Sequence, residues 1–374
     1  MSEVPENSLE SFFERIDDHR RHNKLHKLID VILIAICAVV AGADTYEQIE
    51  NFGKKRKRWL LRFLELPYGI PSHDTFGRIF ERMNPNEFQN CFKLWIESVT
   101  DRTKGQVIAI DGKTLRRSHD RSSDKKAIHM ISAWASSNQV VLGQLKTKEK
   151  SNEITAIPHL LRLLDISGCI ITIDAMGTQK KIAQTIIKND GDYILAVKEN
   201  HKTLYDETVL FFKEMESMEL EGFTFDKYET VDGGHGRIET RKYAMTSDID
   251  WLQDKEKWAG LKSLGMVEST REIKGECSHE KRYYISSLEC DAKKFGDAVR
   301  NHWGIENSVH WVLDIAFRED ESRIRKGSAP ENFAAIRHIA LNLLRNNKNF
   351  KGSVKTKRLN AAMDTKYLED VVFR

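Results

Sequence analysis

The fold is decided by two stretches that share one pattern: Val107-Ile-Ala-Ile-Asp111-Gly-Lys113 and Ile170-Ile-Thr-Ile-Asp174-Ala-Met176. In each, a short apolar run is followed by one aspartate and then a small residue, and such a run is typical of a strand buried on both faces. A carboxylate at such a strand end is poorly solvated, which costs free energy unless its charge is compensated. Two such ends that converge can share divalent cations, and paired metals about 4 Å apart catalyse in-line displacement at phosphate.

The residues around these stretches alternate between strand and helix patterns. Three strands separated by turns come first and predict an antiparallel meander. Helices and further strands then alternate, which predicts an α/β fold with a mixed sheet flanked by helices. Beyond the strand before Asp111, the predicted elements are strands 129–135 and 140–146, helix 154–164, strand 170–173, helix 180–188 and strand 193–197.

The chain outside this alternating region has other patterns, and five segments are expected. Thr45 and the stretch 71–75 resemble helix caps, so the N-terminal part is either a helix-turn-helix or a plain helical bundle. The tail is basic and is expected to be loosely ordered. The segments are an N-terminal helical, DNA-binding domain (1–103), the first part of the catalytic domain (104–200), an inserted β-rich region (201–290), late helices (291–350) and the basic tail (351–374).

Positive charge is concentrated in two places, although the formal net charge is only +3. Residues 323–358 contain ten Lys or Arg and one acid, and Lys54-Lys-Arg-Lys-Arg58 forms a second basic run. Localised positive charge on a nearly neutral chain predicts a polyanionic partner, and the alternative is a solvated basic face.

Composition argues against a membrane protein and against a disulfide-stabilised secreted one. The five cysteines are scattered without a CxxC pair, which favours a reduced, cytoplasmic protein. The longest apolar stretch, 31–43, is shorter than the roughly 20 residues that a membrane span needs.

A late helix carries a third candidate acid. His302, Glu306 and His310 follow one another at four-residue intervals and form a polar stripe on one helix face. One metal ion cannot reach all three, because the stripe extends about 12 Å along the helix. Glu306 is therefore interpreted as a third acid, and the alternative is an ordinary exposed helix face.

Six motifs in this order resemble those of the H-repeat-associated transposases, bacterial insertion-sequence transposases of the DDE superfamily. The resemblance covers residues 10–350 and includes PSHDTFGRIF at 71–80. The motifs are AIDGKTLRRS (109–118), KSNEI (150–154), TIDAMGTQKKIA (172–183), DYILAVKENHKTL (192–204), HGRIETR (235–241) and HWGIENSVHW (302–311).

This resemblance implies an RNase H-like catalytic domain whose three acids are Asp111, Asp174 and Glu306. It implies two Mg²⁺ ions, or Mn²⁺, held by these carboxylates, and cleavage of transposon ends followed by strand transfer into target DNA. Double-stranded DNA is the expected partner, with a homodimer on the DNA. Related transposases carry Tyr, Arg and Lys around the glutamate, where this chain has Val299, His302 and Leu313.

Several other residues are candidates near the site. Glu153 is either a fourth acid beside the site or a helix-cap partner. A nuclease that cuts without joining and a DNA-binding protein with an idle site are the alternative functions. The candidate DNA contacts are Lys113, Lys198, His235, Arg237, His302, Lys54, Arg56 and Arg58.

Overall fold

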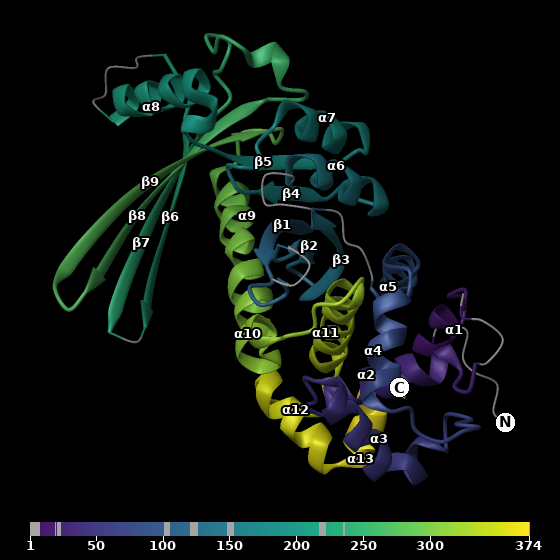
Figure 1. The fold of residues 1–374 in the computed structure, drawn as a ribbon. Coiled ribbons are helices and arrows are strands. Elements are labelled where there is room, and N and C mark those ends of the chain that lie inside the picture. The colour runs from purple at the N-terminus through teal and green to yellow at the C-terminus, as the bar shows by residue number, and fades with distance from the viewer. Residues whose placement is uncertain are drawn as a thin grey trace.

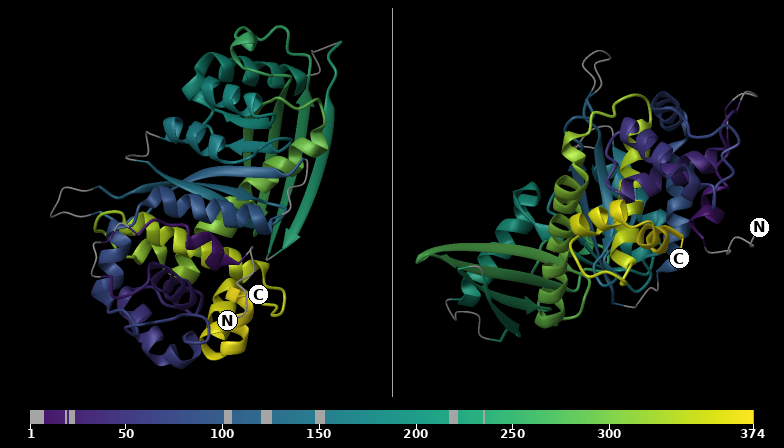
Figure 2. Two further views of the ribbon diagram at one scale, coloured as in Figure 1. Left: turned by 90° about the vertical axis from the view of Figure 1, so that its right-hand side faces the viewer. Right: turned by 90° about the horizontal axis from the view of Figure 1, so that it is seen from below.

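The computed structural model describes residues 8–18, 20, 24–100, 105–119, 126–147, 153–216, 222–234 and 236–373. Helices from both ends of the chain group at one end of the molecule, and a set of long strands projects at the other (Figures 1 and 2). The central sheet lies between these two parts. In the part of the chain that the structure describes, no helix combines the length and the apolar character needed to cross a membrane.

The N-terminal region is helical, as predicted. The central helix α2 is buried on nearly all sides, whereas α3 and α4 start at side-chain caps: Thr45 Oγ1 accepts from the Gln48 amide, and Ser72 Oγ accepts from the Thr75 amide, both at 3.3 Å. These caps satisfy amides that lack a partner within the helix. The helices are α1 (Leu9–Phe13), α2 (Leu28–Val40), α3 (Tyr46–Leu60), α4 (His73–Arg82) and α5 (Pro85–Val99).

The first five strands form the RNase H-like mixed sheet that was predicted. Strands β1, β2 and β3 form the antiparallel meander, and β4 and β5 continue the sheet in parallel with β1. The strands are β1 (Val107–Thr114), β2 (His129–Ala135), β3 (Val140–Thr147), β4 (Ile170–Ile173) and β5 (Asp192–Val197). Helices α6 (Glu153–Leu163) and α7 (Lys180–Lys188) pack on this sheet (Figure 1).

The inserted region contains the predicted strands, and they extend the same sheet. Strand β9 pairs antiparallel with β5, so one nine-stranded sheet runs in the order β3-β2-β1-β4-β5-β9-β8-β7-β6. The far ends of these strands project away from the helices (Figure 1). The inserted elements are α8 (Lys202–Glu216), β6 (Asp226–Gly234), β7 (Arg237–Thr246), β8 (Ser263–Ile273) and β9 (Glu276–Ser286).

The predicted long helix near residue 300 is continuous but changes its winding. Helix α9 (Ala292–Gly304) leads into a π-helical segment (Ile305–His310) and then into α10 (Trp311–Phe317). Helix α9 lies along β1, β4 and β5, and it also packs on β6 and β7. The same helix therefore connects the two halves of the sheet.

The expectation of a loosely ordered tail is wrong. After α11 (Ala329–Asn346), the chain forms α12 (Val354–Met363) and α13 (Thr365–Phe373). The contacts of the buried Arg358 explain why the tail is ordered. Its guanidinium donates to the Val39 carbonyl at 2.9 and 3.0 Å, to Asp44 Oδ1 at 3.0 Å and to the Ala316 carbonyl. One basic residue of the tail thus joins the C-terminal ends of α2 and α10.

Candidate active site

Asp111 lies within β1, directly after the residues that pair with β4, and faces the π-helical segment. The Gly112 amide donates to Asp111 Oδ1 at 2.8 Å, and His310 Nδ1 lies 3.4 Å from Asp111 Oδ2. Burial, together with the negative charges of Asp174, Glu153 and Glu306, raises the pKa of Asp111 to about 7. The carboxylate therefore lies where added positive charge is strongly favoured.

Asp174 directly follows β4, the parallel neighbour of β1. Because Ile110 pairs with Ile173, the two aspartates occupy equivalent places, each directly after the stretch over which β1 and β4 pair. Asp174 Oδ1 accepts from the Gly177 amide at 3.1 Å, which fixes the turn before α7. Parallel pairing thus brings together two acids that are 63 positions apart in the sequence.

Glu306 lies in the π-helical segment, and its side chain is exposed. π-Helical insertions are often found at functional sites. A cavity of about 330 Å³ is lined by all three predicted acids. Its other charged or polar lining residues include Lys198, Arg282, Thr172 and His302.

The cavity does not by itself contain a complete metal site. Within the described ranges, no three or more His, Cys, Asp or Glu side chains are grouped closely enough to hold a metal ion. The three predicted acids therefore line the same cavity without being grouped this closely. The donor set fits Mg²⁺ in another way, because Mg²⁺ commonly uses one or two carboxylates and takes its other ligands from water and substrate phosphates.

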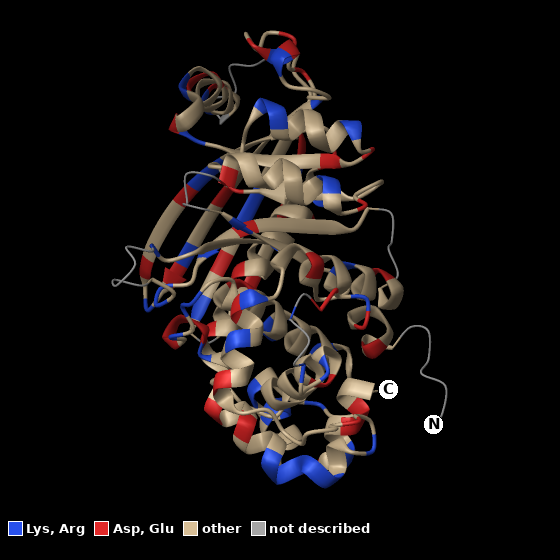
Figure 3. Ribbon diagram, turned by 45° about the vertical axis from the view of Figure 1, so that its right-hand side comes forward, with Lys and Arg blue, Asp and Glu red and all other residues tan. Residues whose placement is uncertain are grey.

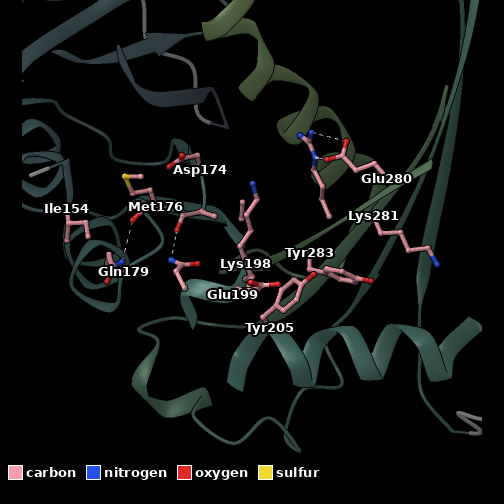
Figure 4. Close-up of a pocket in the computed structure, with 15 residues that line it drawn as sticks. Ile154, Asp174, Met176, Gln179, Lys198, Glu199, Tyr205, Glu280, Lys281 and Tyr283 are labelled. Carbon is pink, nitrogen blue, oxygen red and sulfur yellow. Dashed lines mark hydrogen bonds and ion pairs between the residues drawn. The ribbon is translucent and has the colours of Figure 1, made fainter. Parts of the chain in front are cut away.

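A second cavity, of about 580 Å³, adjoins the first. Both are lined by Asp174, Lys198 and Arg282. Figure 4 shows Asp174 and Met176 on one side of the larger cavity and Tyr205 and Tyr283 on the other, with Lys198 between them. Asp111 and Glu306 therefore line only the smaller cavity, whereas the lining that the two cavities share contains one acid, Asp174, and two cations.

Comparison with known proteins shows to which protein family the chain belongs. The profile described as "Transposase DDE domain" matches residues 102–343, and the profile described as "DDE_Tnp_1-associated" matches residues 10–96. The chain belongs to the Transposase DDE domain family. This family match, together with the similarity to an H repeat-associated putative transposase, confirms the predicted resemblance.

Relatives of this DDE transposase span almost its whole length. It is 45% identical over 370 residues to "Putative transposase YncI" of Escherichia coli O157:H7, covering 98% of this chain and 94% of the relative. It is 45% identical over 363 residues to "H repeat-associated putative transposase YhhI" of Escherichia coli K12, covering 96% and 95%. A synaptic complex of piggyBac transposase with hairpin DNA aligns with a TM-score of 0.43 at 12% identity, covering 99% of this chain and 78% of that one.

In this transposase, Lys113 makes contacts other than the predicted one to DNA. Strand β1 does continue past Asp111, but Lys113 Nζ bonds to Asp314 and lies 2.9 Å from Glu319 Oε2. Glu319 is almost fully buried, which alone would raise its pKa, but Lys113 and Arg337 hold that pKa at about 2. Lys113 therefore joins β1 to the helix that carries Glu306.

His302 cannot replace the arginine of related transposases as a positive charge. Its Nδ1 lies 3.0 Å from Thr172 Oγ1, and burial lowers its pKa to about 4. The imidazole is therefore neutral at pH 7, although it lines the smaller cavity. Burial likewise lowers the pKa of His310 to about 3, so the histidine beside Asp111 is also neutral.

The remaining predicted contacts lie in different parts of the molecule. Lys198 lines both cavities, Arg237 is exposed at the outer end of β7, and His235 lies outside the described residues. The basic run lies on α3, and Lys and Arg gather on a helix at that end of the molecule (Figure 3). Within it Lys54 pairs with Glu50, Arg56 donates to the Ala362 carbonyl at 2.8 Å, and Arg58 is exposed.

Arg282 of β9 was missed by sequence reasoning. It lines both cavities, its guanidinium lies 4.3 Å from the centre of the Trp303 ring, and it bonds to Glu280 at 2.8 and 2.9 Å. Nothing in its strand pattern distinguishes it from other charged residues of the insertion. Its place beside the acids follows only from the pairing of β9 with β5.

Proposed function

We propose that this transposase cleaves DNA at the ends of its element and joins the freed 3′ ends to target DNA. The observation that carries the proposal is the smaller cavity, which is lined by Asp111, Asp174 and Glu306 from three distant segments and by Lys198 and Arg282. Acids beside cations suit a phosphodiester, since the acids attract divalent metal and the cations attract the phosphate.

Each charged residue has a definite part in this proposal. Asp111 and Asp174 would hold Mg²⁺ or Mn²⁺, and Glu306 would complete the ligands of one of two ions when DNA is bound. Bound ions supply activation of the attacking water or 3′-hydroxyl and stabilisation of the leaving oxygen. Lys198 and Arg282 would hold the neighbouring phosphates of the strand, because both side chains line both cavities.

Double-stranded DNA is the proposed partner, in the form of element ends and target. Contacts made mainly to phosphates require that affinity fall steeply with salt. Because two ends have to be processed together, we propose that the chain acts as a homodimer on DNA. The exposed Arg58 on α3 and Arg237 on β7 are candidates for contacts outside the cavity.

The deciding experiment is cleavage of the DNA that flanks the protein's own gene, with Mg²⁺ and with EDTA. Nicks at the element ends that require Mg²⁺ are expected. The variants D111N, D174N and E306Q should lose these nicks and keep DNA binding. Metal-dependent nicking that persists in all three variants would contradict the assignment.

A pre-cut donor separates a transposase from a plain nuclease. A DNA whose 3′-hydroxyl already ends at the element boundary is incubated with a target plasmid and Mg²⁺. Joined products are expected from the proposed function. Cutting of an intact donor without joining would indicate a nuclease, and DNA binding without either reaction would indicate an idle site.

A further inference from the structure

A buried acid–histidine pair lies beneath the catalytic strand end. Glu153 begins α6 and His129 begins β2, and both are almost fully buried, at 6% and 2% exposure. Glu153 Oε1 contacts His129 Nε2, and His129 Nδ1 lies 2.9 Å from Thr114 Oγ1. Neither side chain lines either of the two cavities described above, so direct contact with DNA does not explain the pair.

The pair packs directly against the backbone at Gly112. A Cβ atom at this position would lie 2.5 Å from Glu153 Oε1 and 3.0 Å from Glu153 Cδ, and closer still to His129 Nε2. Only glycine therefore permits this contact. Because successive residues of a strand face opposite sides, the pair lies on the face opposite Asp111 and Lys113.

The Gly112 peptide connects the pair to the candidate active site. Gly112, against whose Cα Glu153 and His129 pack, also donates its amide to Asp111 Oδ1 at 2.8 Å. A shift of Gly112 would therefore move the donor that orients the carboxylate. On the other face, Lys113 is held by Asp314 and Glu319, so the strand end is fixed from both sides.

We propose that Glu153 and His129 are positioning residues, which hold the Gly112 peptide so that the Asp111 carboxylate keeps the orientation needed to bind metal. The inference rests on the proposed function, because it concerns the metal site of that function. Glu153 is then neither a metal ligand nor a simple cap partner. Groups that orient a metal ligand typically change metal affinity by 10- to 100-fold when they are removed.

The test uses the full chain bound to DNA from its element end. Binding of Mn²⁺ to this complex is measured directly by electron paramagnetic resonance. We expect E153A to weaken binding at the Asp111-dependent site by about 10- to 100-fold. E153Q should remain within a few-fold of wild type, because the amide fills the same space against Gly112 and His129. Melting temperatures are recorded for every variant.

A matched control separates positioning from general destabilisation. Glu239 is a similarly buried acid, at 5% exposure, and it pairs with Arg241 and Arg271 in the projecting part of the sheet. E239A should lower the melting temperature comparably and leave Mn²⁺ affinity unchanged. Equal losses of Mn²⁺ affinity in E239A and E153A would overturn the positioning role.

A milder variant keeps the test decisive if E153A does not fold. Thr114 is exposed, and T114V removes only the hydroxyl next to His129 Nδ1. We expect T114V to weaken Mn²⁺ binding about threefold, because Glu153 still holds the histidine. Unchanged affinity in T114V would overturn the proposal in that case.

The outcomes also distinguish this proposal from the function on which it rests. Mn²⁺ binding that does not change in D111N would overturn both the metal site and the positioning role. Binding that is lost in D111N but unchanged in E153A would overturn the positioning role alone.

Discussion

The nine-stranded sheet has an enclosed half, strands β1–β5, and a projecting half, strands β6–β9. The two halves differ in how they accommodate charge. Strands β2 and β4 are buried along their whole length, whereas the outer ends of β6 and β9 are exposed. In the enclosed half, Lys113 and Glu319 form a pair with side chains 12% and 2% exposed. In the projecting half, Arg300 and Asp232 pair at 48% and 44%. The same residue types therefore have different energetic consequences in the two halves.

The difference follows from solvation. Water screens an exposed pair and solvates either partner alone, so such pairs contribute little. A buried pair cannot lose one partner without leaving an uncompensated charge. The enclosed half can therefore hold carboxylates whose pKa values are strongly shifted, whereas the projecting half exposes its charged side chains to solvent.

The largest expected contrast is catalytic. D111N, D174N and E306Q should each lower cleavage by at least about 10³-fold, because each removes a charge from the proposed metal site. D232N, an equivalent change in the projecting half, should leave the rate of cleavage near that of wild type. Rates are measured with saturating Mg²⁺ on DNA from the element end. A comparable loss in D232N would break the distinction between the two halves.

The second contrast concerns stability. K113A should lower the free energy of unfolding by about 3–5 kcal/mol, because Glu319 and Asp314 would lose their buried partner. R300A should lower it by about 1 kcal/mol or less, because its pair with Asp232 is exposed. Urea titration measures both values. Equal losses would mean that burial does not decide the strength of these pairs.

The third contrast is the pH dependence of stability. The pKa of Asp111 is raised from 3.8 to about 7, so the folded state binds a proton more tightly than the unfolded state does. Without metal, Asp111 should therefore contribute a decrease of up to about 4 kcal/mol in the free energy of unfolding as pH rises from about 4 to 7. Buried His302 and His310 contribute in the opposite direction, because their pKa values are lowered, so the Asp111 contribution is measured as the difference between wild type and D111N. D111N should remove this decrease, and urea titrations of metal-free protein across that range measure it.

Asp232 provides a control of opposite sign. Its bond to Arg300 lowers its pKa, so its contribution is present above its ordinary value and is lost as pH falls below it. D232N should therefore leave the decrease between pH 4 and 7 intact. If that decrease disappeared in D232N and persisted in D111N, the assignment of the raised pKa would be wrong.

The smallest contrast lies where the two halves meet. R282A should weaken binding of element-end DNA about tenfold, since Arg282 lines both cavities. It should also reduce the slope of log affinity against log salt concentration by about one, because one phosphate contact is lost. K255A removes a cation that pairs with Asp250 away from the cavities, and it should change neither quantity. Gel shifts at several salt concentrations compare them. An unchanged salt dependence in R282A would remove it from the proposed DNA contacts.

Local sequence determined much of this protein. The apolar runs before Asp111 and Asp174 specify buried strands, because a short run rich in β-branched residues, with no polar face, fits the buried interior of a sheet. Parallel pairing of such strands then brings their two carboxyl ends to one edge of the sheet. The caps at Thr45 and Ser72 were also predictable, since a cap depends on residues within one turn.

Only the tertiary structure decided which partners the charged residues have. Lys113 reaches acids about 200 positions later, Arg282 joins the cavities through the pairing of β9 with β5, and the tail is ordered by the contacts of Arg358. The periodicity of the local sequence predicts which face of an element is buried, but it does not predict which distant segment covers that face. The positions of the acids could therefore be predicted, whereas the neighbours that set their charge and orientation required the fold.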